Sequence, residues 1–298
     1  MAKIEVKNLK KKYGDNLVLD NISLTFDENK ICGLLGRNGA GKTTLLNIIT
    51  NRVFQDGGTV EVDGENIREN DNALEKIYFM TERNLFPEGY KVKDIFKWTA
   101  EFYLNFNMDY ALELAKKFEL DISKKIKNLS TGYKSIAKII TAMSSQADIV
   151  IYDEPVLGLD ANHRELFYKE LMDDYIKNPK TIILSTHIIE EVSNLLENVV
   201  ILNDKKIVST EEAEELLNRV YTVSGLSQNV DKYIEAKEIE TKKIVNIETL
   251  SNYKSATVID EINNEDKELG ENLGLEFSKV ELQKLFIYLT SRGEEQDD

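Results

Sequence analysis

The order of apolar and polar residues along the chain predicts strands alternating with helices. Residues 4–7 and 22–26 alternate apolar with polar side chains, as half-buried strands do. Nearly continuous apolar runs at 31–35, 149–152 and 181–184 predict strands that are covered on both faces. This combination indicates an α/β protein with a mixed sheet.

Two further segments complete this first part of the chain. Residues 92–120 carry apolar side chains at helical spacing and contain no proline, which predicts a helical region. Residues 199–202 and 206–208 predict a closing hairpin around the pair Asn203-Asp204.

The remaining residues predict a small α+β domain of their own. A strand–helix–strand–strand–helix–strand order, followed by a helix, is expected at 221–223, 230–236, 244–250, 254–259, 266–272, 275–280 and 281–289. This order fits a split βαβ domain. Charge favours the same boundary, because residues 221–298 carry nine basic and 17 acidic residues. We therefore predict domains at 1–220 and 221–298, with a solvated, disordered acidic tail GEEQDD.

Composition narrows the class of protein. With 38 basic and 53 acidic residues the net charge is −15, which argues against nucleic acid as a partner. Hydrophobic residues make up 42% of the chain and exclude wholesale disorder. Cys32 is the single cysteine, so no intramolecular disulfide is expected. No run approaches the ~18 apolar residues of a membrane span, and the first residues lack the apolar core of a signal peptide. A cytoplasmic protein is expected.

A glycine-rich loop follows the predicted strand at 31–35. Residues 36–43 read GRNGAGKT, which matches the phosphate-binding pattern GxxxxGK[ST]. Glycines let backbone N–H groups approach phosphate oxygens, and the helix that follows presents its positive end to the same anion. Lys42 would neutralise the β- and γ-phosphates, and the Thr43 hydroxyl would ligate Mg²⁺. The residues expected to bind ATP here are Gly36, Asn38, Gly39, Ala40, Gly41, Lys42, Thr43 and Thr44.

Two adjacent carboxylates follow the predicted strand at 149–152. Ligands bind beyond the carboxyl ends of strands in open α/β sheets. Asp153 is expected to hold Mg²⁺, and Glu154 is expected to polarise the attacking water as a general base. Beside a phosphate loop, this pair predicts a nucleotide hydrolase.

Further motifs point to a family. Residues 129–133 read LSTGY and resemble the signature of ABC-transporter ATPases, and residues 157–160, LGLD, resemble their D-loop. His187 in LSTH resembles their switch histidine, and Tyr13 in KKYG resembles the aromatic residue that stacks on adenine. The resemblance covers about residues 1–220. It implies a P-loop NTPase fold of ABC type, with flanking helices and a helical subdomain at about 83–145.

The resemblance also implies roles. Tyr13 would stack on adenine beside Val18, and His187 would contact the γ-phosphate and position the water of Glu154. Two subunits would sandwich two ATP molecules, with Asp160 coupling the two sites. The signature residues expected to complete the partner's site are Ser130, Thr131 and Gly132. Taken alone, Ser130 and Thr131 also fit a helix cap, a role compatible with phosphate binding. His163 has no motif around it and is expected to be a solvated helix residue.

The chain departs from the family pattern at two places. Glu82 stands where family members usually carry a glutamine; a carboxylate can still ligate Mg²⁺ but adds charge beside the γ-phosphate. Thr131 and Tyr133 stand where glycine and glutamine are commonest. Variants of this kind are similar to those of bacitracin-type drug or peptide exporters.

Partners follow from the resemblance. A chain with a single phosphate loop and no membrane span is expected to be a separate ATPase subunit on the inner face of the membrane. It would dock on a multi-span permease through residues 82–98, where Leu85, Phe86 and Trp98 are either contacts or core residues, Trp98 more often core. A second ATPase subunit is expected, as homodimer or heterodimer. The alternatives are an ABC ATPase of cofactor assembly without a membrane partner, and a regulatory module in residues 221–298. ATP hydrolysis is expected to power transport, with export as the direction that the resemblance favours; the residues themselves specify neither the transported substrate nor the direction.

Overall fold

The computed structural model describes residues 2–291, so the predicted acidic tail lies outside the described residues. The chain forms two compact units. The first runs to residue 188 and includes residues 194–210, and the second combines residues 189–193 with the chain from residue 211 onward. This division falls ten residues before the boundary expected from charge.

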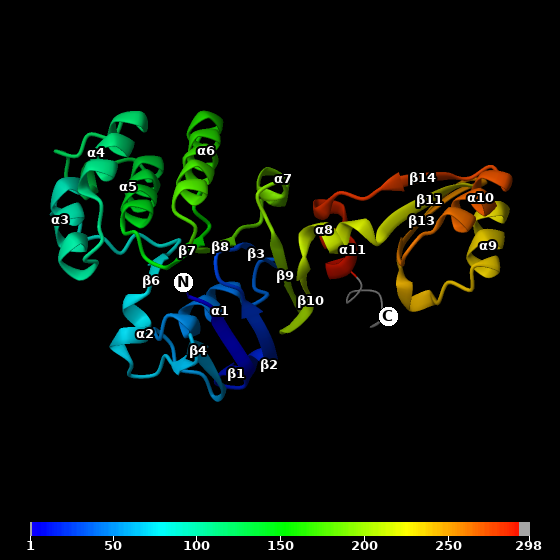
Figure 1. Ribbon diagram of the computed structural model, residues 1–298, viewed down its shortest axis with the longest axis horizontal. Coiled ribbons are helices and arrows are strands. Elements are labelled where there is room, and N and C mark those ends of the chain that lie inside the picture. The colour runs from blue at the N-terminus through cyan, green and yellow to red at the C-terminus, as the bar shows by residue number, and fades with distance from the viewer. Residues whose placement is uncertain (1, 292–298) are drawn as a thin grey trace. The chain divides into compact units, whose positions relative to one another are not determined.

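Two sheets form the first unit (Figure 1). A four-stranded sheet has the order β2-β1-β4-β5, and its paired neighbours are antiparallel. A six-stranded sheet has the order β10-β9-β3-β8-β7-β6, and β3 pairs in parallel with β8 and β9 while β7 pairs in parallel with β6 and β8. The strands are β1 (Ile4–Tyr13), β2 (Asn16–Phe26), β3 (Ile31–Leu35), β4 (Gly57–Val62), β5 (Glu65–Asn66), β6 (Ile77–Met80), β7 (Ile149–Asp153), β8 (Thr181–Ser185), β9 (Asn198–Asn203) and β10 (Lys206–Glu212).

The central strands of the six-stranded sheet are buried at every residue, as their continuous apolar runs predict. Strands β3, β7 and β8 have no exposed position. Because parallel strands all end at the same edge of a sheet, the residues that follow β3, β7 and β8 are brought together. This edge is where the predicted phosphate loop and acidic pair lie.

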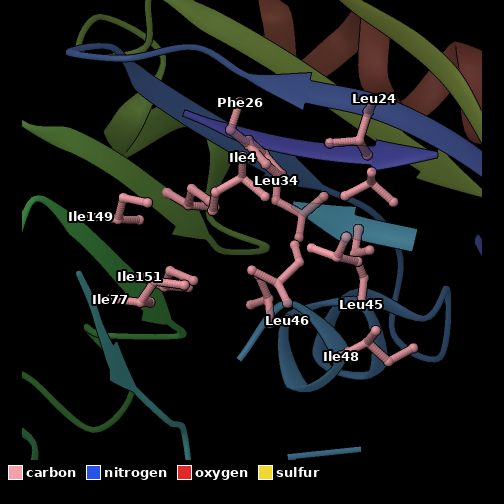
Figure 2. Close-up of a cluster of buried hydrophobic side chains, with 14 of the residues drawn as sticks. Ile4, Leu24, Phe26, Leu34, Leu45, Leu46, Ile48, Ile77, Ile149 and Ile151 are labelled. Atoms are coloured by element: carbon pink, nitrogen blue, oxygen red, sulfur yellow. The ribbon is translucent and has the colours of Figure 1, made fainter. Parts of the chain in front are cut away.

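A shared apolar core fixes the helix that follows the phosphate loop. Helix α1 (Lys42–Ile49) directs Leu45, Leu46 and Ile48 into a cluster that includes Leu34 of β3 and Phe26 of β2. Figure 2 shows these side chains gathered between the helix and the strands, with Ile149 and Ile151 of β7 beside them. The loop between β3 and α1 is therefore held at both ends by buried side chains.

The helical region expected at 92–120 is confirmed, and the chain forms two helices there. Helix α3 (Val92–Phe102) ends where Tyr103 adopts an extended backbone. Helix α4 (Met108–Lys117) begins where the Asn107 side chain accepts a hydrogen bond from the Tyr110 N–H. A capping asparagine, which apolar spacing does not reveal, starts the second helix.

The remaining helices of the first unit connect the strands. They are α2 (Asp71–Glu75), the 3₁₀ helix η1 (Ile126–Asn128), α5 (Thr131–Ser144) and α6 (Ala161–Lys177). Strands β9 and β10 are joined through Asp204 and Lys205, whose φ angles of 42° and 65° suit the tight turn of a hairpin. The turn thus lies one residue later than the expected pair Asn203-Asp204.

The second unit has the predicted split βαβ order. Its sheet runs β12-β13-β11-β14, and all the paired strands are antiparallel. Val223, Val230 and Tyr233 are fully buried in its core, with Ala256 and Val258. The elements are α7 (Ile189–Val192), α8 (Ala213–Asn218), β11 (Val220–Leu226), α9 (Ser227–Ala236), η2 (Thr241–Lys243), β12 (Ile244–Leu250), β13 (Tyr253–Ile259), α10 (Asn264–Asn272), β14 (Glu276–Lys279) and α11 (Leu282–Ser291).

Among residues 2–291, no helix has both the length and the apolar character needed to cross a bilayer.

Truncation of a buried core side chain is expected to lower the free energy of unfolding much more than truncation of an exposed apolar side chain. Leu34 is fully buried on β3, so Leu34→Ala is expected to lower the free energy of unfolding of the first unit by about 2–5 kcal/mol. Ile176 on α6 is 70% exposed, so Ile176→Ala is expected to change it by less than about 0.5 kcal/mol. Urea unfolding of both variants measures the difference. Equal midpoints would contradict the packing described here.

Candidate functional site

The carboxyl ends of the central strands open into a cavity of about 420 Å³. Its lining includes the loop after β3 and the pair Asp153 and Glu154 at the end of β7. Glu82, two residues after β6, and His187, two residues after β8, line it as well. The lining residues are Val18, Arg37, Asn38, Gly39, Gly41, Lys42, Thr43, Thr44, Glu82, Asp153, Glu154, Leu157 and His187. The structure therefore gathers the predicted phosphate loop, acidic pair, Glu82 and switch histidine around one space.

The loop backbone depends on glycine where α1 begins. Gly41 has a φ of 107°, and a Cβ at this position would lie 2.9 Å from Leu19 Cδ2 and 3.2 Å from the Val18 carbonyl oxygen. Gly41 is the N-cap residue of α1 and has no side chain to cap the first turn. The first N–H groups of the helix are thus left for an anion in the cavity.

Lys42 is held at the loop by main-chain oxygens. Its Nζ donates hydrogen bonds to the carbonyl oxygens of Gly36 at 2.6 Å and Arg37 at 3.4 Å. Burial lowers the pKa of Lys42, while the charges of Glu154 and Asp153 act in the opposite direction. A cation at this place meets the negative charge that phosphates bring.

Asp153 lies at the end of β7 and is 1% exposed. Its carboxylate accepts hydrogen bonds from Thr43 Oγ1 at 3.1 Å and from Ser185 Oγ at 2.9 Å. Burial is the main cause that raises the pKa of Asp153, and the charges of Glu154 and Glu82 add to it. The Asp153 carboxylate and the Thr43 hydroxyl are two hard oxygen donors, which fit Mg²⁺ together with phosphate oxygens. Among residues 2–291, no group of three or more His, Cys, Asp or Glu side chains is arranged to hold a metal by itself.

Ser185 is a site residue that the sequence reasoning missed. It lies opposite Asp153 in the parallel register of β7 and β8. The sequence does show Ser185 as the first polar residue after the apolar run 182–184. That Ser185 bonds to Asp153, however, follows only from the pairing of β7 with β8.

Glu154 and His187 form a hydrogen-bonded pair. His187 Nδ1 lies 2.8 Å from Glu154 Oε2. The backbone of Glu154 is in the left-handed region, with a φ of 49°, and its N–H donates to the Ser185 carbonyl oxygen at 2.8 Å. The Glu154 side chain is 13% exposed and that of His187 is 50% exposed. The strained backbone and the histidine together aim the carboxylate at the cavity.

The signature and D-loop residues cap two helices. The Ser130 hydroxyl accepts a hydrogen bond from the Tyr133 N–H at 3.3 Å at the start of α5. The Asp160 carboxylate accepts one from the His163 N–H at 3.0 Å at the start of α6. Neither Ser130 nor Asp160 lines the cavity of this chain, and the same holds for Thr131, Gly132 and Tyr13.

The two helix starts touch through their backbones. A Cβ on Gly132 would lie 2.7 Å from the Gly158 carbonyl oxygen, so no side chain fits between them. Ser135 Oγ also donates to the Leu157 carbonyl oxygen at 3.0 Å. The signature helix and the D-loop therefore form one packed surface.

The expectation that His163 is a solvated helix residue is wrong. Its side chain is 23% exposed, and Nδ1 lies 2.9 Å from Asp160 Oδ2. The ring lies nearly parallel to that of Phe118, with centroids 6.2 Å apart, and edge-on to Tyr133 at 6.1 Å. The contacts join α4, α5 and α6, which no local sequence pattern indicates.

Two aromatic residues singled out by the sequence, Tyr13 for adenine and Trp98 for the permease contact or the core, lie at the surface. Tyr13 is 49% exposed, with the Lys11 ammonium 5.1 Å from its ring centroid. Trp98 is 37% exposed, with its ring 4.2 Å from that of Tyr90, so the expectation that it belongs to the core is wrong. It lines a largely apolar groove of about 670 Å³, with Asp71, Leu74, Glu75, Tyr78, Phe86, Pro87, Ile95, Thr99, Phe102 and Tyr103. Leu85, 62% exposed, is outside this lining.

Lys138 is a second residue that the sequence reasoning missed. It is 7% exposed on α5, and its Nζ donates to the carbonyl oxygens of Thr81 at 2.9 Å and Glu82 at 2.6 Å. Burial lowers the pKa of Lys138 to about 8, and the charges of Glu82 and Asp153 oppose this change. The available signal was a single lysine inside the apolar run 136–143.

Comparisons with known proteins show the family and the fold that this chain resembles. A family model described as "ABC transporter" matches residues 19–157. The chain is 31% identical to the ABC transporter ATP-binding protein YtrB of Bacillus subtilis, over 72% of this chain and 73% of that protein. It is 30% identical to the bacitracin transport ATP-binding protein BcrA of Enterococcus faecalis, over 88% and 87%. A solved ATP-binding subunit of an ABC transporter has a TM-score of 0.65 and 23% identity, covering 72% of this chain and 91% of that one.

The cap at Asp160 predicts a stability effect that is separable from charge. Asp160→Ala removes the acceptor for the first turn of α6 and is expected to lower the free energy of unfolding by about 1 kcal/mol. Asp160→Asn retains an acceptor oxygen and is expected to lose much less. Urea unfolding measures both variants. An equal loss in the two would mean that Asp160 does not stabilise α6 as a cap.

Proposed function

The chain belongs to the family of ABC transporter ATP-binding proteins, and we propose that two such subunits close on ATP to power export through a separate membrane permease. As a member of this family it binds and hydrolyses ATP in the service of a transporter. The hydrolytic residues, the dimer, the permease contact and the direction of transport are the proposed parts.

Glu154 is the proposed general base. A water between Glu154 and the γ-phosphate would give its proton to the carboxylate as its oxygen attacks phosphorus, and the bond from phosphorus to the β–γ bridging oxygen would break to leave ADP and phosphate. His187, bonded to Glu154 Oε2 at 2.8 Å, would hold that carboxylate in place. Lys42 and the N–H groups of the loop would bind the charge that develops on the phosphate oxygens.

Mg²⁺ is the proposed metal partner of ATP. When bound, it would neutralise charge on the β- and γ-phosphates. Thr43 Oγ1 and Asp153 would hold it, because they already lie 3.1 Å apart at the cavity, and Glu82 offers a further oxygen. Tyr13 and Val18 are the proposed contacts of the adenine base, and of the two only Val18 lines the cavity.

One observation favours a dimer above all. Ser130, Thr131 and Gly132 carry the family's phosphate-binding signature, yet they lie outside the cavity of their own chain. Their helix, α5, begins with an N-cap serine, which suits a phosphate presented by another subunit. Each site would thus be completed by the partner's signature, and Asp160 in the adjoining D-loop would couple the two sites. A homodimer is sufficient, and a related ATPase is the other acceptable partner.

The apolar groove beside Trp98 is the proposed permease contact. Phe102 in this groove is 78% exposed, and Asp71 and Glu75 add negative charge to its lining. A short apolar segment with basic residues, from a cytoplasmic loop of a multi-span permease, fits that lining. Export is proposed because Thr131 and Tyr133 of the signature resemble the variants of bacitracin-type exporters, and the similarity to a bacitracin transport protein over 88% of the chain supports that subtype.

Removal of the proposed base gives the first functional prediction. Glu154→Gln keeps the shape and a hydrogen bond to His187 but cannot accept the proton, so ATP hydrolysis is expected to fall by about 10²-fold or more. ATP binding is expected to persist and to trap a dimer. ATPase assays and gel filtration with ATP measure these effects, and hydrolysis at the parental rate would rule out Glu154 as the base.

A second variant, Ser130→Arg, is the control for the ATP-dependent dimer, because it is expected to block the proposed dimer interface. Ser130→Arg places a long side chain at the start of α5, away from the cavity of its own subunit. In the Glu154→Gln background it is expected to abolish the ATP-dependent dimer while monomeric nucleotide binding remains. An unchanged dimer fraction would contradict the composite site.

The groove predicts membrane association. Phe102→Glu puts a charge into the proposed contact and is expected to reduce the membrane-bound fraction in cells by roughly tenfold, with ATPase activity of the purified protein retained. Ile176→Glu changes an equally exposed apolar residue outside the groove and is the matched control. Cell fractionation with detection of a co-purifying multi-span protein is the measurement.

The same experiment tests the alternative of an ATPase for cofactor assembly. A parental protein found wholly in a complex without membrane proteins would overturn the transport proposal. Loss of membrane association in both Phe102→Glu and Ile176→Glu would instead place the contact elsewhere.

A further inference from the structure

Lys138 is a buried lysine whose ammonium group lies inside the protein. It occupies α5 between Ala137 and Ile139, and 7% of its surface is exposed. An ammonium group is strongly disfavoured away from water unless hydrogen bonds and opposite charges replace its hydration. The surroundings of Lys138 must therefore supply both.

The hydrogen bonds come from the main chain beyond β6. The parallel pairing of β6 with β7 ends at Met80 and Tyr152. Lys138 Nζ donates to the next two carbonyl oxygens, those of Thr81 at 2.9 Å and Glu82 at 2.6 Å. Lys138 thus holds the backbone of residues 81–82, which lies beyond the last paired residue of β6.

The opposite charges come from the cavity. Glu82, Asp153 and Glu154 place three carboxylates around the space proposed for the γ-phosphate. The negative charges of Glu82 and Asp153 act on Lys138 and favour its charged form. Lys42 and Arg37 belong to the phosphate loop, whereas Lys138 approaches the same carboxylates from α5.

We propose that Lys138 is a positioning residue of the hydrolytic site, which fixes residues 81–82 and offsets the negative charge that Glu82 adds beside the γ-phosphate. The inference rests on the hydrolytic site proposed above. It also links two elements, because Lys138 and the signature residue Ser130 are carried by the same stretch of α5 and its cap. A shift of α5 on closure of the dimer would therefore move Glu82.

A double-mutant cycle on the full chain tests the charge relation. Lys138→Met keeps the apolar stem and removes the ammonium group, and it is expected to lower kcat by roughly tenfold or more with a smaller change in KM. Glu82→Gln alone is expected to lower kcat a few-fold. In the Lys138→Met background, Glu82→Gln is expected to raise kcat, because it removes a carboxylate that has lost its counter-charge. The expected coupling between the two positions is about fivefold or more.

Lys180→Met is the matched control. Lys180 is also 7% exposed, but its Nζ pairs with Asp174 at 2.9 Å, whereas Lys138 Nζ bonds to the main chain of residues 81–82; neither lysine lines the cavity itself. Its loss is expected to lower the thermal midpoint while kcat stays within about twofold of the parent. It is also expected to show no coupling with Glu82→Gln.

Two further variants keep the test decisive if Lys138→Met does not fold. Lys138→Arg retains the charge and several donors and is expected to keep more activity than Lys138→Gln, which retains a donor alone. Circular dichroism and thermal unfolding identify the folded variants. Equal kcat values for Lys138→Arg and Lys138→Gln would overturn the inference. A double variant of Lys138 and Glu82 whose kcat is within twofold of the product of the two single effects would also overturn it.

The outcome also separates this inference from the proposed hydrolytic site. If Glu154→Gln is inactive while Lys138→Met behaves as Lys180→Met does, the site stands and the positioning role of Lys138 falls. If Glu154→Gln hydrolyses ATP at the parental rate, the proposed site falls. In that case, the same double-mutant cycle of Lys138→Met and Glu82→Gln is measured as the Kd for the fluorescent analogue mant-ATP with Mg²⁺. Non-additive changes in this Kd would show that the two residues act together, and additive changes would show that they do not.

Discussion

The parallel pairing of β3, β7 and β8 is the constraint on which the proposed hydrolytic site depends. It sets Asp153 opposite Ser185 and within 3.1 Å of the Thr43 hydroxyl, although these residues are far apart along the chain. The pairing is stabilised by burial of all three strands and by the core that anchors α1. Apolar side chains therefore determine where the polar groups meet.

The site concentrates negative charge before any phosphate arrives. Three carboxylates line a cavity whose proposed ligand is itself anionic, and burial disfavours the charged form of Asp153. Two buried lysines offset this charge from different elements, Lys42 from the phosphate loop and Lys138 from the signature helix. Charge balance thus ties the loop, the strand ends and α5 into one electrostatic unit.

A second surface is built around the starts of α5 and α6. Gly132 meets the backbone of Gly158, and the His163 ring joins Asp160 to Tyr133. Neither Ser130 of the signature nor Asp160 of the D-loop lines the cavity of its own chain, although Leu157 of the D-loop does. This geometry supports the proposal that a partner subunit supplies further phosphate contacts.

The sequence by itself determined the α/β class, the position of the glycine-rich loop and the acidic pair after two buried strands, and the order of elements in the second unit, because these depend on local spacing and short motifs. It predicted a helical region at 92–120 without the break before Asn107, and its expectations that His163 is solvated and that Trp98 is a core residue were wrong. Capping by a side chain and ring contacts between segments lie outside any periodic pattern. Ser185 and Lys138 were missed for the same reason. Only the tertiary structure decides which carboxylate a serine meets across a sheet and which main-chain oxygens a buried lysine reaches, since both follow from packing between segments distant in the chain.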